Sequence, residues 1–399
     1  MKANRNSVLT INGGSSSIKF ALFNKEEPPL QLFHGEIEGM GSKNAQLRFT
    51  NSMTAQQNSI PLPTADYSEA ANLLIKWLEK QQEFVSIEAI GHRIVHGMKH
   101  TNPEPITATL LAELKQISVY DPVHLPLAIM LIEIFQKQYP DLTQIACFDT
   151  SFHASMPSVA KQLAIPRRFS DKGIQRYGFH GLSYAYLMQE LKRVAGNETA
   201  QGKIILAHLG NGASLAAVKE GKSMDTSMGF TPTSGLVMGT RTGDLDPGVG
   251  LYLIESEKMN AKQFNHLINH ESGLLGISET NADMRELLEQ EGTDHRAAEA
   301  VELFCYQTKK WIGAYAAVLG GLDTLIFSAG IGEHSPEVRK RICDGLQFLG
   351  IELDEPRNEK NEAIISTDTS KVCVRIIKTN EELMIAIAVC ELLNHSVKS

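Results

Sequence analysis

The sequence predicts a two-domain α/β protein whose second half repeats the opening of its first half. At 399 residues the chain is longer than one hydrophobic core usually supports. Two short apolar strands, Val8–Ile11 and Ile204–His208, are each followed by a glycine-rich turn and a second apolar strand. Glycine permits positive φ and lets backbone N–H groups approach a ligand closely. The matching turns therefore favour a duplicated domain with a polyanion held between the copies.

The first half begins with strands and then alternates strands with helices. Alternating and apolar runs predict a four-stranded meander and then two further strands, with three helices among them. The strands are expected at residues 7–12, 17–23, 30–36, 45–50, 87–91 and 144–148, and the helices at 68–82, 107–118 and 126–136.

The second half repeats that opening, with strands expected at residues 203–208, 214–219, 222–226, 324–328 and 372–377. The clearest helix is Asp294–Leu319, which is apolar at i, i+3 and i+4 spacing. A last helix follows Asn380, a good N-cap residue. The segment 227–250 is long, irregular and rich in Gly, Pro and Thr, which favours an active-site loop.

Composition excludes several functional classes. With 42% hydrophobic and 21% charged residues the chain is an ordinary globular protein. Its net charge of −8 argues against broad binding to nucleic acid or anionic membranes, although a few local cations and a metal can still meet ATP. The five cysteines form no C-x-x-C pair and predict buried free thiols. Without a signal-peptide core or a membrane-length apolar run, a cytoplasmic location is expected.

The first glycine turn carries polar groups. Asn12, the hydroxyls of Ser15, Ser16 and Ser17, and Lys19 can hold a metal-bound water or a phosphate. The alternative is a polar β-hairpin with a solvated lysine. Nearby, His92, His96 and His100 have the spacing of a helical metal face, but the segment is predicted to be a strand bracketed by glycines.

Arginine and aspartate side chains follow predicted strands. Arg93 stands at a strand end, where a guanidinium binds carboxylate or phosphate bidentately. Asp149 ends an apolar strand and suits either ligand binding or helix capping. His180 lies between two glycines and is either a hydrogen-bonded structural residue or a catalyst. Arg241, followed by Asp244 and Asp246, suits a mobile cation over a transferring phosphoryl group.

Two glycine motifs remain. Residues 328–336 are predicted to form a strand, a glycine turn and a helix that offer backbone N–H groups to phosphates or a nucleoside. Gly221-Lys222-Ser223 resembles the end of a Walker A loop, but Ala216 occupies the position of its first glycine. A hairpin turn is therefore expected there. No G-x-S-x-G motif is present, which argues against a serine hydrolase.

These motifs together resemble the acetate kinase family. The similar strings run in family order along almost the whole chain: VLTINGGSSSIKF, GHRIVHG, FDTSFHASMP, RYGFHG, HLGNGASLAAVKEGKSMDTSMGFTP, GLVMGTRTGDLDPG, SGLLGIS, DMRE, FSAGIGEHSPEVR and TNEELMIA. The resemblance implies two ribonuclease-H-like domains around a cleft, the fold of acetate and sugar kinases, actin and heat-shock chaperone ATPases. It places the domains at residues 1–150, completed by a helix at 380–399, and at 151–379, with homodimer contacts mostly from the second.

The reaction that the resemblance implies is reversible transfer of the ATP γ-phosphoryl group to acetate, giving ADP and acetyl phosphate. Mg²⁺, or Mn²⁺ in its place, would be held through water by Asn12 and Glu381. Asp149, His180 and Arg241 match the family's catalytic positions. Arg93 would bind acetate, and Val95, Val123, Phe179 and Pro232 would surround its methyl group. The positions expected around ATP are Ser15, Ser17, Lys19, His208, Leu209, Gly210, Asn211, Gly212, Asp283, Met284, Arg285, Gly330, Ile331, Gly332, Glu333 and His334.

Chemistry refines one role and leaves alternatives open. Acetate is already an anion at neutral pH, so Asp149 is expected to orient Arg93 or the metal water rather than act as a base. Leu125, Leu182, Tyr184, Thr233-Ser234 and His334 depart from the family's usual residues. Val123 is smaller than the usual leucine, which favours acceptance of propionate. The alternatives are therefore a propionate or other short-chain acyl kinase, or an ATP-gated switch protein.

Overall fold

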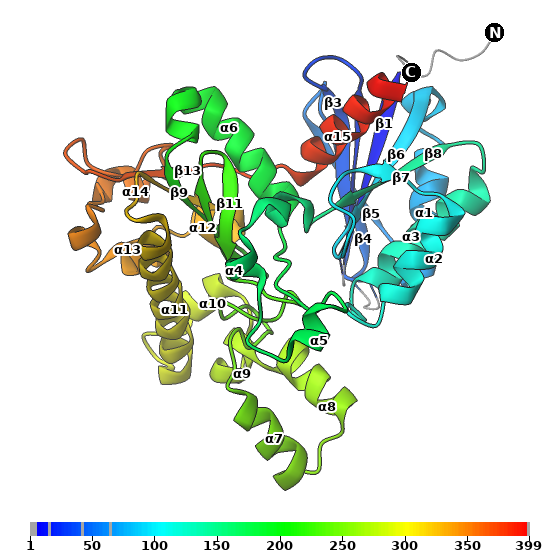
Figure 1. Cartoon of the computed structure of the whole chain (residues 1–399). Coiled ribbons are helices and arrows are strands. Elements are labelled where there is room, and N and C mark those ends of the chain that lie inside the picture. The colour runs from blue at the N-terminus through cyan, green and yellow to red at the C-terminus, as the bar shows by residue number, and fades with distance from the viewer. Residues whose placement is uncertain (1–5, 15–16, 41–43, 64–65, 397–399) are drawn as a thin grey trace. The chain divides into compact units, whose positions relative to one another are not determined.

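The computed structural model describes residues 6–14, 17–40, 44–63 and 66–396. The chain divides into two compact units: unit 1 is Met1–Ser151 with Asn380–Ser399, and unit 2 is Phe152–Thr379. Each unit is built on one mixed β-sheet flanked by helices (Figure 1). No helix of the described residues is both long and apolar enough to cross a membrane.

Unit 1 contains an eight-stranded sheet in the order β5-β4-β3-β2-β1-β6-β8-β7. Strands β1 to β5 are antiparallel neighbours, whereas β6 is parallel to β1 and β8 is parallel to β6. Their bounds are β1 Ser7–Gly13, β2 Ile18–Asn24, β3 Gln31–Glu38, β4 Gln46–Asn51, β5 Gln56–Pro61, β6 Ile87–Ile94, β7 Glu104–Pro105 and β8 Thr143–Phe148. The polar edge strand β5 is absent from the sequence prediction because it has no apolar alternation.

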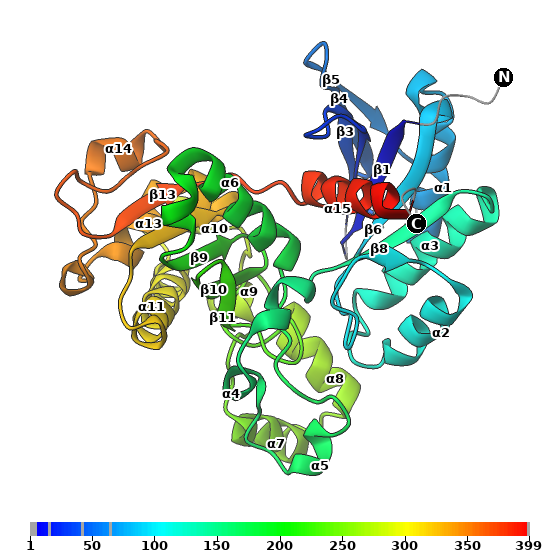
Figure 2. The ribbon, with the colours of Figure 1, turned by 45° about the horizontal axis from the view of Figure 1, so that its top comes forward.

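Helices cover both faces of this sheet. Helices α1 (Tyr67–Leu78), α2 (Ala108–Ile117) and α3 (Leu125–Gln138) begin at Asp66, Thr107 and His124. Helix α15 (Glu381–Ser396) returns from the far end of the sequence to lie beside β1 (Figures 1 and 2). It packs so closely that a Cβ on Gly91 would lie 2.4 Å from the Cγ2 of Ile385.

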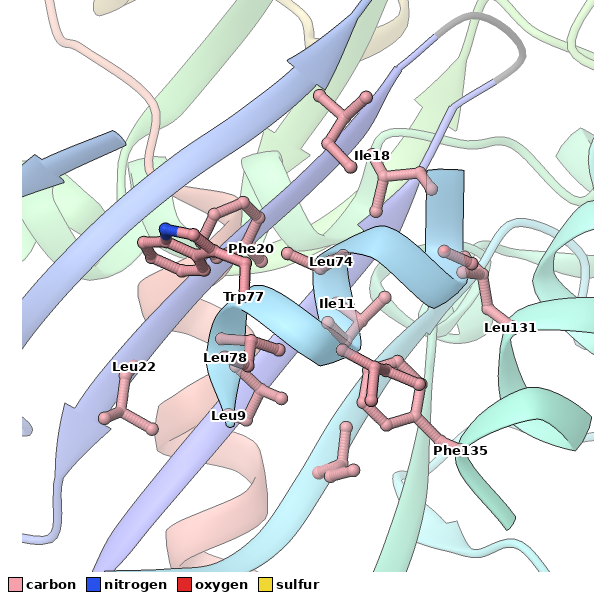
Figure 3. Close-up of a cluster of buried hydrophobic side chains, with 14 of the residues drawn as sticks. Leu9, Ile11, Ile18, Phe20, Leu22, Leu74, Trp77, Leu78, Leu131 and Phe135 are labelled. Carbon is pink, nitrogen blue, oxygen red and sulfur yellow. The ribbon is translucent and has the colours of Figure 1, made fainter. Parts of the chain in front are cut away.

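Strand alternation decides which face each helix covers. Leu9 and Ile11 on β1 and Phe20 on β2 pack with Leu74 of α1 and Phe135 of α3 (Figure 3). Ala21 and Phe23, on the opposite face of β2, pack with Ala386 of α15. Successive side chains of a strand point to opposite faces, so one apolar strand serves both layers.

Unit 2 contains a five-stranded sheet in the order β11-β10-β9-β12-β13. Its strands are β9 Lys203–Leu209, β10 Ala213–Lys219, β11 Lys222–Thr226, β12 Thr324–Ser328 and β13 Cys373–Ile376. Its longer helices are α6 Gly181–Ala200, α7 Pro247–Ser256, α11 His295–Leu319 and α13 Pro336–Cys343. The shorter ones are α4 Ser158–Lys161, α5 Arg167–Ser170, α8 Ala261–His266, α9 Gly273–Ser278, α10 Met284–Gln290, α12 Ala329–His334 and α14 Glu355–Glu359.

The central strands of the two sheets share one topology. In unit 2, β9 is antiparallel to β10 and parallel to β12, as β1 is antiparallel to β2 and parallel to β6 in unit 1. The predicted duplication of a ribonuclease-H-like α/β fold is therefore confirmed. The hairpin predicted at Gly221 is confirmed as well, because Glu220 and Gly221 both have positive φ and Lys219 faces Lys222. All five cysteines are free thiols, and only Cys373 is not fully buried.

Candidate active site

Three parallel strands of unit 1 bring polar side chains to one edge of the sheet. Asn12 lies near the end of β1, Arg93 near the end of β6, and Asp149 directly after β8. The strands are in register, with Ile11 beside His92 and Arg93 beside Cys147. Because the carboxyl ends of parallel strands meet at the same edge, these side chains lie close together.

Arg93 is the centre of this group. Its Nε and Nη2 donate to Oδ2 of Asp149 at 2.9 and 2.5 Å, and its Nη1 donates to Oδ1 of Asn12 at 3.0 Å. Asp149 is completely buried. Burial alone would lower the pKa of Arg93, but the nearby carboxylates of Asp149, Glu381 and Glu382 raise it above its ordinary value. The guanidinium is therefore permanently charged and fixed in orientation.

The start of α15 adds two carboxylates. The Nδ2 group of Asn12 donates to Oε2 of Glu381 at 2.9 Å and to Oε1 of Glu382 at 3.2 Å. The sequence resemblance pointed to Asn12 and Glu381, which lie 369 residues apart and meet here. Glu382 is absent from the prediction. Adjacent residues of a helix usually face different directions, so the sequence carried no signal that both would reach Asn12.

These residues suit a magnesium ion. Amide and carboxylate oxygens are the donors that Mg²⁺ prefers, and it usually takes only one or two carboxylates together with water and phosphate. Within the described residues no three His, Cys, Asp or Glu side chains form a closed metal cage. The oxygens of Asn12 and Glu381 are donors of the kind that an ion keeping most of its water uses.

The first glycine turn lies beside this group. Gly14 N donates to the carbonyl of Ser17 at 2.8 Å, and Ser15 lies outside the described residues. Lys19 is exposed on β2, opposite Glu36 of β3. It borders a hollow of about 730 Å³ that also includes Asn380 and Glu382 at the start of α15. Lys19 thus lines the same hollow as Glu382, which accepts a hydrogen bond from Asn12.

The three histidines around Arg93 do not form a metal site. His92 is buried, and burial lowers its pKa to about 4 although Gln144 opposes the shift. His100 contacts the carboxylates of Glu104 and Glu113 at 2.6 and 2.9 Å. His92 lies in strand β6, as predicted, and not on a helix.

In unit 2, two stacked histidines lie beside the second glycine turn. His180 precedes α6 with a left-handed φ of 57°, and its ring lies 4.1 Å from that of His208 at 22°. Nδ1 of His180 is 2.8 Å from Oγ of Ser214, and Nδ1 of His208 is 2.8 Å from Oγ of Ser183. Both rings are therefore fixed by stacking and by a hydroxyl at the same nitrogen.

Arg241 reaches the same turn. A Cβ on Gly212 would lie 3.4 Å from Nε2 of His180 and 3.8 Å from Nη1 of Arg241. Nη1 of Arg241 also donates to the carbonyl of Pro232 at 3.2 Å. One imidazole nitrogen and one guanidinium nitrogen thus lie near the same face of this glycine, where two donors can face one anion.

The arginine loop is anchored on both sides, although the sequence suggested a mobile cation. Gly239 N donates to the carbonyl of Asn211 at 3.0 Å, and Leu274 N donates to that of Met238 at 2.9 Å. Gly273 has φ +65°, and a Cβ there would lie 2.2 Å from the Met238 carbonyl oxygen. Only glycine allows this approach, which the sequence pattern did not reveal.

The segment 328–336 differs from its prediction. Strand β12 passes directly into α12 without a separate turn. Oε1 of Glu333 accepts from Ala329 N at 2.8 Å and from Thr379 N at 3.1 Å. This carboxylate therefore satisfies the N–H group of the first residue of its own helix. A Cβ on Gly210 would lie 3.5 Å from Cβ of Ala329 and 4.0 Å from Gly330 N. The two segments predicted to bind the nucleotide, 208–212 and 330–334, are therefore neighbours. His334 is exposed.

The remaining predicted residues lie on other elements. Asp283 caps α10 and pairs with Arg285 at 2.6 Å, while Met284 is buried in the core. The four residues predicted to surround a methyl group are divided between the units. Val95 and Val123 belong to unit 1, and Phe179 and Pro232 belong to unit 2.

Comparison with known proteins identifies the family. The family model described as the acetokinase family matches residues 7–387. The acetate kinase of Rhodopseudomonas palustris (strain TIE-1) is 42% identical over 386 residues, covering 95% of this chain and 96% of that protein. The crystal structure of a propionate kinase from Francisella tularensis has a TM-score of 0.89 and 36% identity, covering 96% of this chain and 98% of that one. The crystal structure of Porphyromonas gingivalis acetate kinase has a TM-score of 0.85 and 35% identity, covering 97% of this chain and 100% of that one. The chain belongs to the acetokinase family.

Proposed function

We propose that this protein is an acetate kinase, which transfers the γ-phosphoryl group of ATP reversibly to acetate to give ADP and acetyl phosphate. The family match over residues 7–387 supports the reaction class. The observation that carries the proposal is the group around Arg93. Asp149 accepts from two nitrogens of the Arg93 guanidinium, and Asn12 accepts from the third. A guanidinium held in this way suits a small carboxylate.

The chemistry of unit 1 requires orientation rather than a base. Acetate is already ionised at neutral pH, so the main barrier is the approach of two anions in line. Arg93 would bind the acetate carboxylate and reduce that repulsion. Asp149 would keep the guanidinium in one orientation, because two of its nitrogens donate to the same carboxylate oxygen. Asp149 is therefore a positioning residue in this proposal.

In unit 2, His180 and Arg241 would donate to the phosphoryl oxygens as their charge changes in the transition state. Both reach Gly212, which supports a shared anion position. The residues of 208–212 and 330–334 would surround the nucleotide together with Asp283, Met284 and Arg285, and Ser15, Ser17 and Lys19 would face its phosphates.

Asn12 and Glu381 would hold Mg²⁺, or Mn²⁺, through water. The ion would supply neutralisation of the phosphate charge. Glu382, which also accepts from Asn12, would keep that amide in place. The protein's own contribution here is to hold oxygen donors next to Arg93.

We further propose a homodimer in the cytoplasm. Four side chains of α7 in unit 2 are exposed although they are large and apolar: Val249, Leu251, Tyr252 and Ile254. Such a patch favours a protein interface. The free thiols favour a reducing compartment. Sedimentation of the purified protein should give twice the chain mass of 43.9 kDa, and a sedimentation mass equal to one chain would contradict the dimer.

The function is tested by acyl phosphate formation from Mg-ATP with acetate, propionate and butyrate. Acetate is expected to be the best acceptor, with propionate accepted because Val123 is small. A preference for propionate would instead make this a short-chain acyl kinase of another specificity, as the similar propionate kinase structure suggests. Hydrolysis of ATP without acyl phosphate from any acid would overturn the proposal and favour an ATP-gated switch protein.

A further inference from the structure

Tyr184 makes a contact that the proposed reaction does not explain. Its side chain is completely buried on α6, and its hydroxyl lies 2.5 Å from Oγ of Ser214. Ser214 is buried too, and the same Oγ lies 2.8 Å from Nδ1 of His180. The tyrosine hydroxyl is therefore two hydrogen bonds away from a histidine of the candidate active site.

Local structure holds these three groups in place. Tyr184 N donates to the carbonyl of His180 at 3.0 Å in the first turn of α6, so residues i and i+4 lie on the same side of the helix. Ser214 on β10 is paired in register with His208 on β9, whose ring stacks on that of His180. The ring of His180 is thus fixed on one face by His208 and at Nδ1 by Ser214.

The protons in the hydrogen bonds that link Tyr184, Ser214 and His180 can be assigned. A serine hydroxyl has one proton and can accept from another donor, whereas a phenol is the stronger acid of the two hydroxyls. The favoured direction therefore has Tyr184 donating to Ser214, which leaves the serine proton to be donated to Nδ1 of His180. A neutral imidazole that accepts at Nδ1 carries its own proton on Nε2. Nε2 is the nitrogen nearest to Gly212.

One neighbour favours the neutral ring. Arg241 reaches the same glycine as Nε2 of His180, so a positive charge on His180 would be repelled by this guanidinium. His208 stacks on the ring of His180 at 4.1 Å. His208 has an equivalent arrangement, because Ser183 lies between its Nδ1 and the hydroxyl of Thr379 at 2.8 and 2.7 Å. Both stacked rings therefore meet a hydroxyl chain at Nδ1.

We propose that Tyr184 is a positioning residue that acts through Ser214 to hold His180 as the neutral tautomer with its proton on Nε2. Its effect on rate rests on the proposed function, in which Nε2–H of His180 donates to the phosphoryl group. The tautomer itself does not depend on that function. A hydroxyl that served packing alone would not select a tautomer.

The test replaces the hydroxyl but keeps the ring. In Tyr184→Phe, kcat for acetyl phosphate formation should fall about tenfold, the scale of one lost hydrogen bond to an active-site group, with KM for ATP and acetate within about twofold. The ¹⁵N shifts of His180, identified by their absence in His180→Asn, should move from the Nε2–H form toward the Nδ1–H form. Ser214→Ala removes the hydroxyl that lies between Tyr184 and His180, and it should shift the ¹⁵N signals of His180 in the same direction.

A matched control and a double variant complete the design. Tyr315 is also buried in unit 2, and its hydroxyl makes no hydrogen bond within the described residues, so Tyr315→Phe should leave kcat and the His180 spectrum unchanged. In the His180→Ala background, Tyr184→Phe should cause no further loss of kcat. An additional tenfold loss there, or an unchanged tautomer in folded Tyr184→Phe, would overturn the proposal. If the wild-type protein makes no acyl phosphate, the proposed function fails, while the spectra still decide the tautomer.

Discussion

Units 1 and 2 repeat one sheet topology but surround their candidate site residues with different electrostatics. In unit 1, Arg93 is enclosed by the carboxylates of Asp149 and Glu381 and by the amide of Asn12. In unit 2, His180 is held by the neutral hydroxyl of Ser214, and Arg241 donates to a backbone carbonyl. The shared topology fixes where polar side chains gather, and the side chains decide what charge they can meet.

This difference suggests a division of labour in the proposed reaction. In unit 1 the carboxylates neutralise the charge of Arg93 and provide oxygens that a metal can use. This group therefore suits one small carboxylate and Mg²⁺. The donors of unit 2 suit the more highly charged phosphoryl group. The two glycine turns, which look alike in sequence, are therefore expected to differ in function.

Loss of Arg241 should give the largest effect. Arg241→Ala is expected to lower kcat by ~10²–10³-fold, the scale for removing one transition-state donor. The measurement is steady-state acetyl phosphate formation, with the exposed Arg168→Ala of the same unit as control. A loss under about threefold would contradict the role given to unit 2.

In unit 1, the corresponding change is Asp149→Asn. It keeps the shape of the side chain but removes the charge that orients Arg93, so kcat/KM for acetate should fall by roughly 30- to 100-fold. If Asp149 only orients Arg93, the acid limb of the pH–rate profile should stay in place in the variant. Disappearance of that limb would instead assign Asp149 as a base. Asp171→Asn, on the surface, is the control.

Each unit also contains a buried histidine that should weaken the fold in acid. Burial lowers the pKa of His92 in unit 1 and of His153 in unit 2 from 6.5 to about 4, against smaller opposing hydrogen bonds. Since the unfolded chain binds these protons first, stability is complete above about pH 6.5 and is lost as the pH falls toward 4.

At pH 5 the loss should be about 2 kcal/mol for each histidine. Urea unfolding at pH 7 and pH 5 should therefore show a smaller difference in His92→Gln and in His153→Gln than in the wild-type protein. The exposed His295→Gln should keep the full difference. If only one of the buried variants changes the pH dependence, the two units are not equivalent in acid stability.

The smallest expected effect concerns the acyl group. Val123→Leu adds one methylene to a half-buried position of unit 1 and should lower kcat/KM for propionate relative to acetate by about tenfold. Acceptor specificity measured for both acids is the readout, with the exposed Val119→Leu as control. An unchanged ratio would show that Val123 does not contact the acyl chain.

Sequence patterns predicted most of the fold because they are local. Apolar alternation predicts β1 to β4 and β9 to β11. Asn380 is predicted as the N-cap of the last helix, and its Oδ1 accepts from Leu383 N at the start of α15. The exposed strand β5 was missed because its stability comes from pairing with β4 rather than from apolar side chains. Glu382 was missed because its contact with Asn12 depends on how α15 packs on the sheet.

The residues alone reveal the duplicated strand and turn pattern, the individual arginine, aspartate and histidine candidates, and the family resemblance. Which of these residues touch depends on how strands and helices pack. Asn12 meets Glu381 across 369 residues because the last helix returns to the first sheet. Tyr184 reaches His180 through Ser214 because a strand 30 residues later lies beside the start of α6. Hydrogen bonds between distant residues depend on strand order and helix packing, and neither is encoded in the local pattern around any one of them.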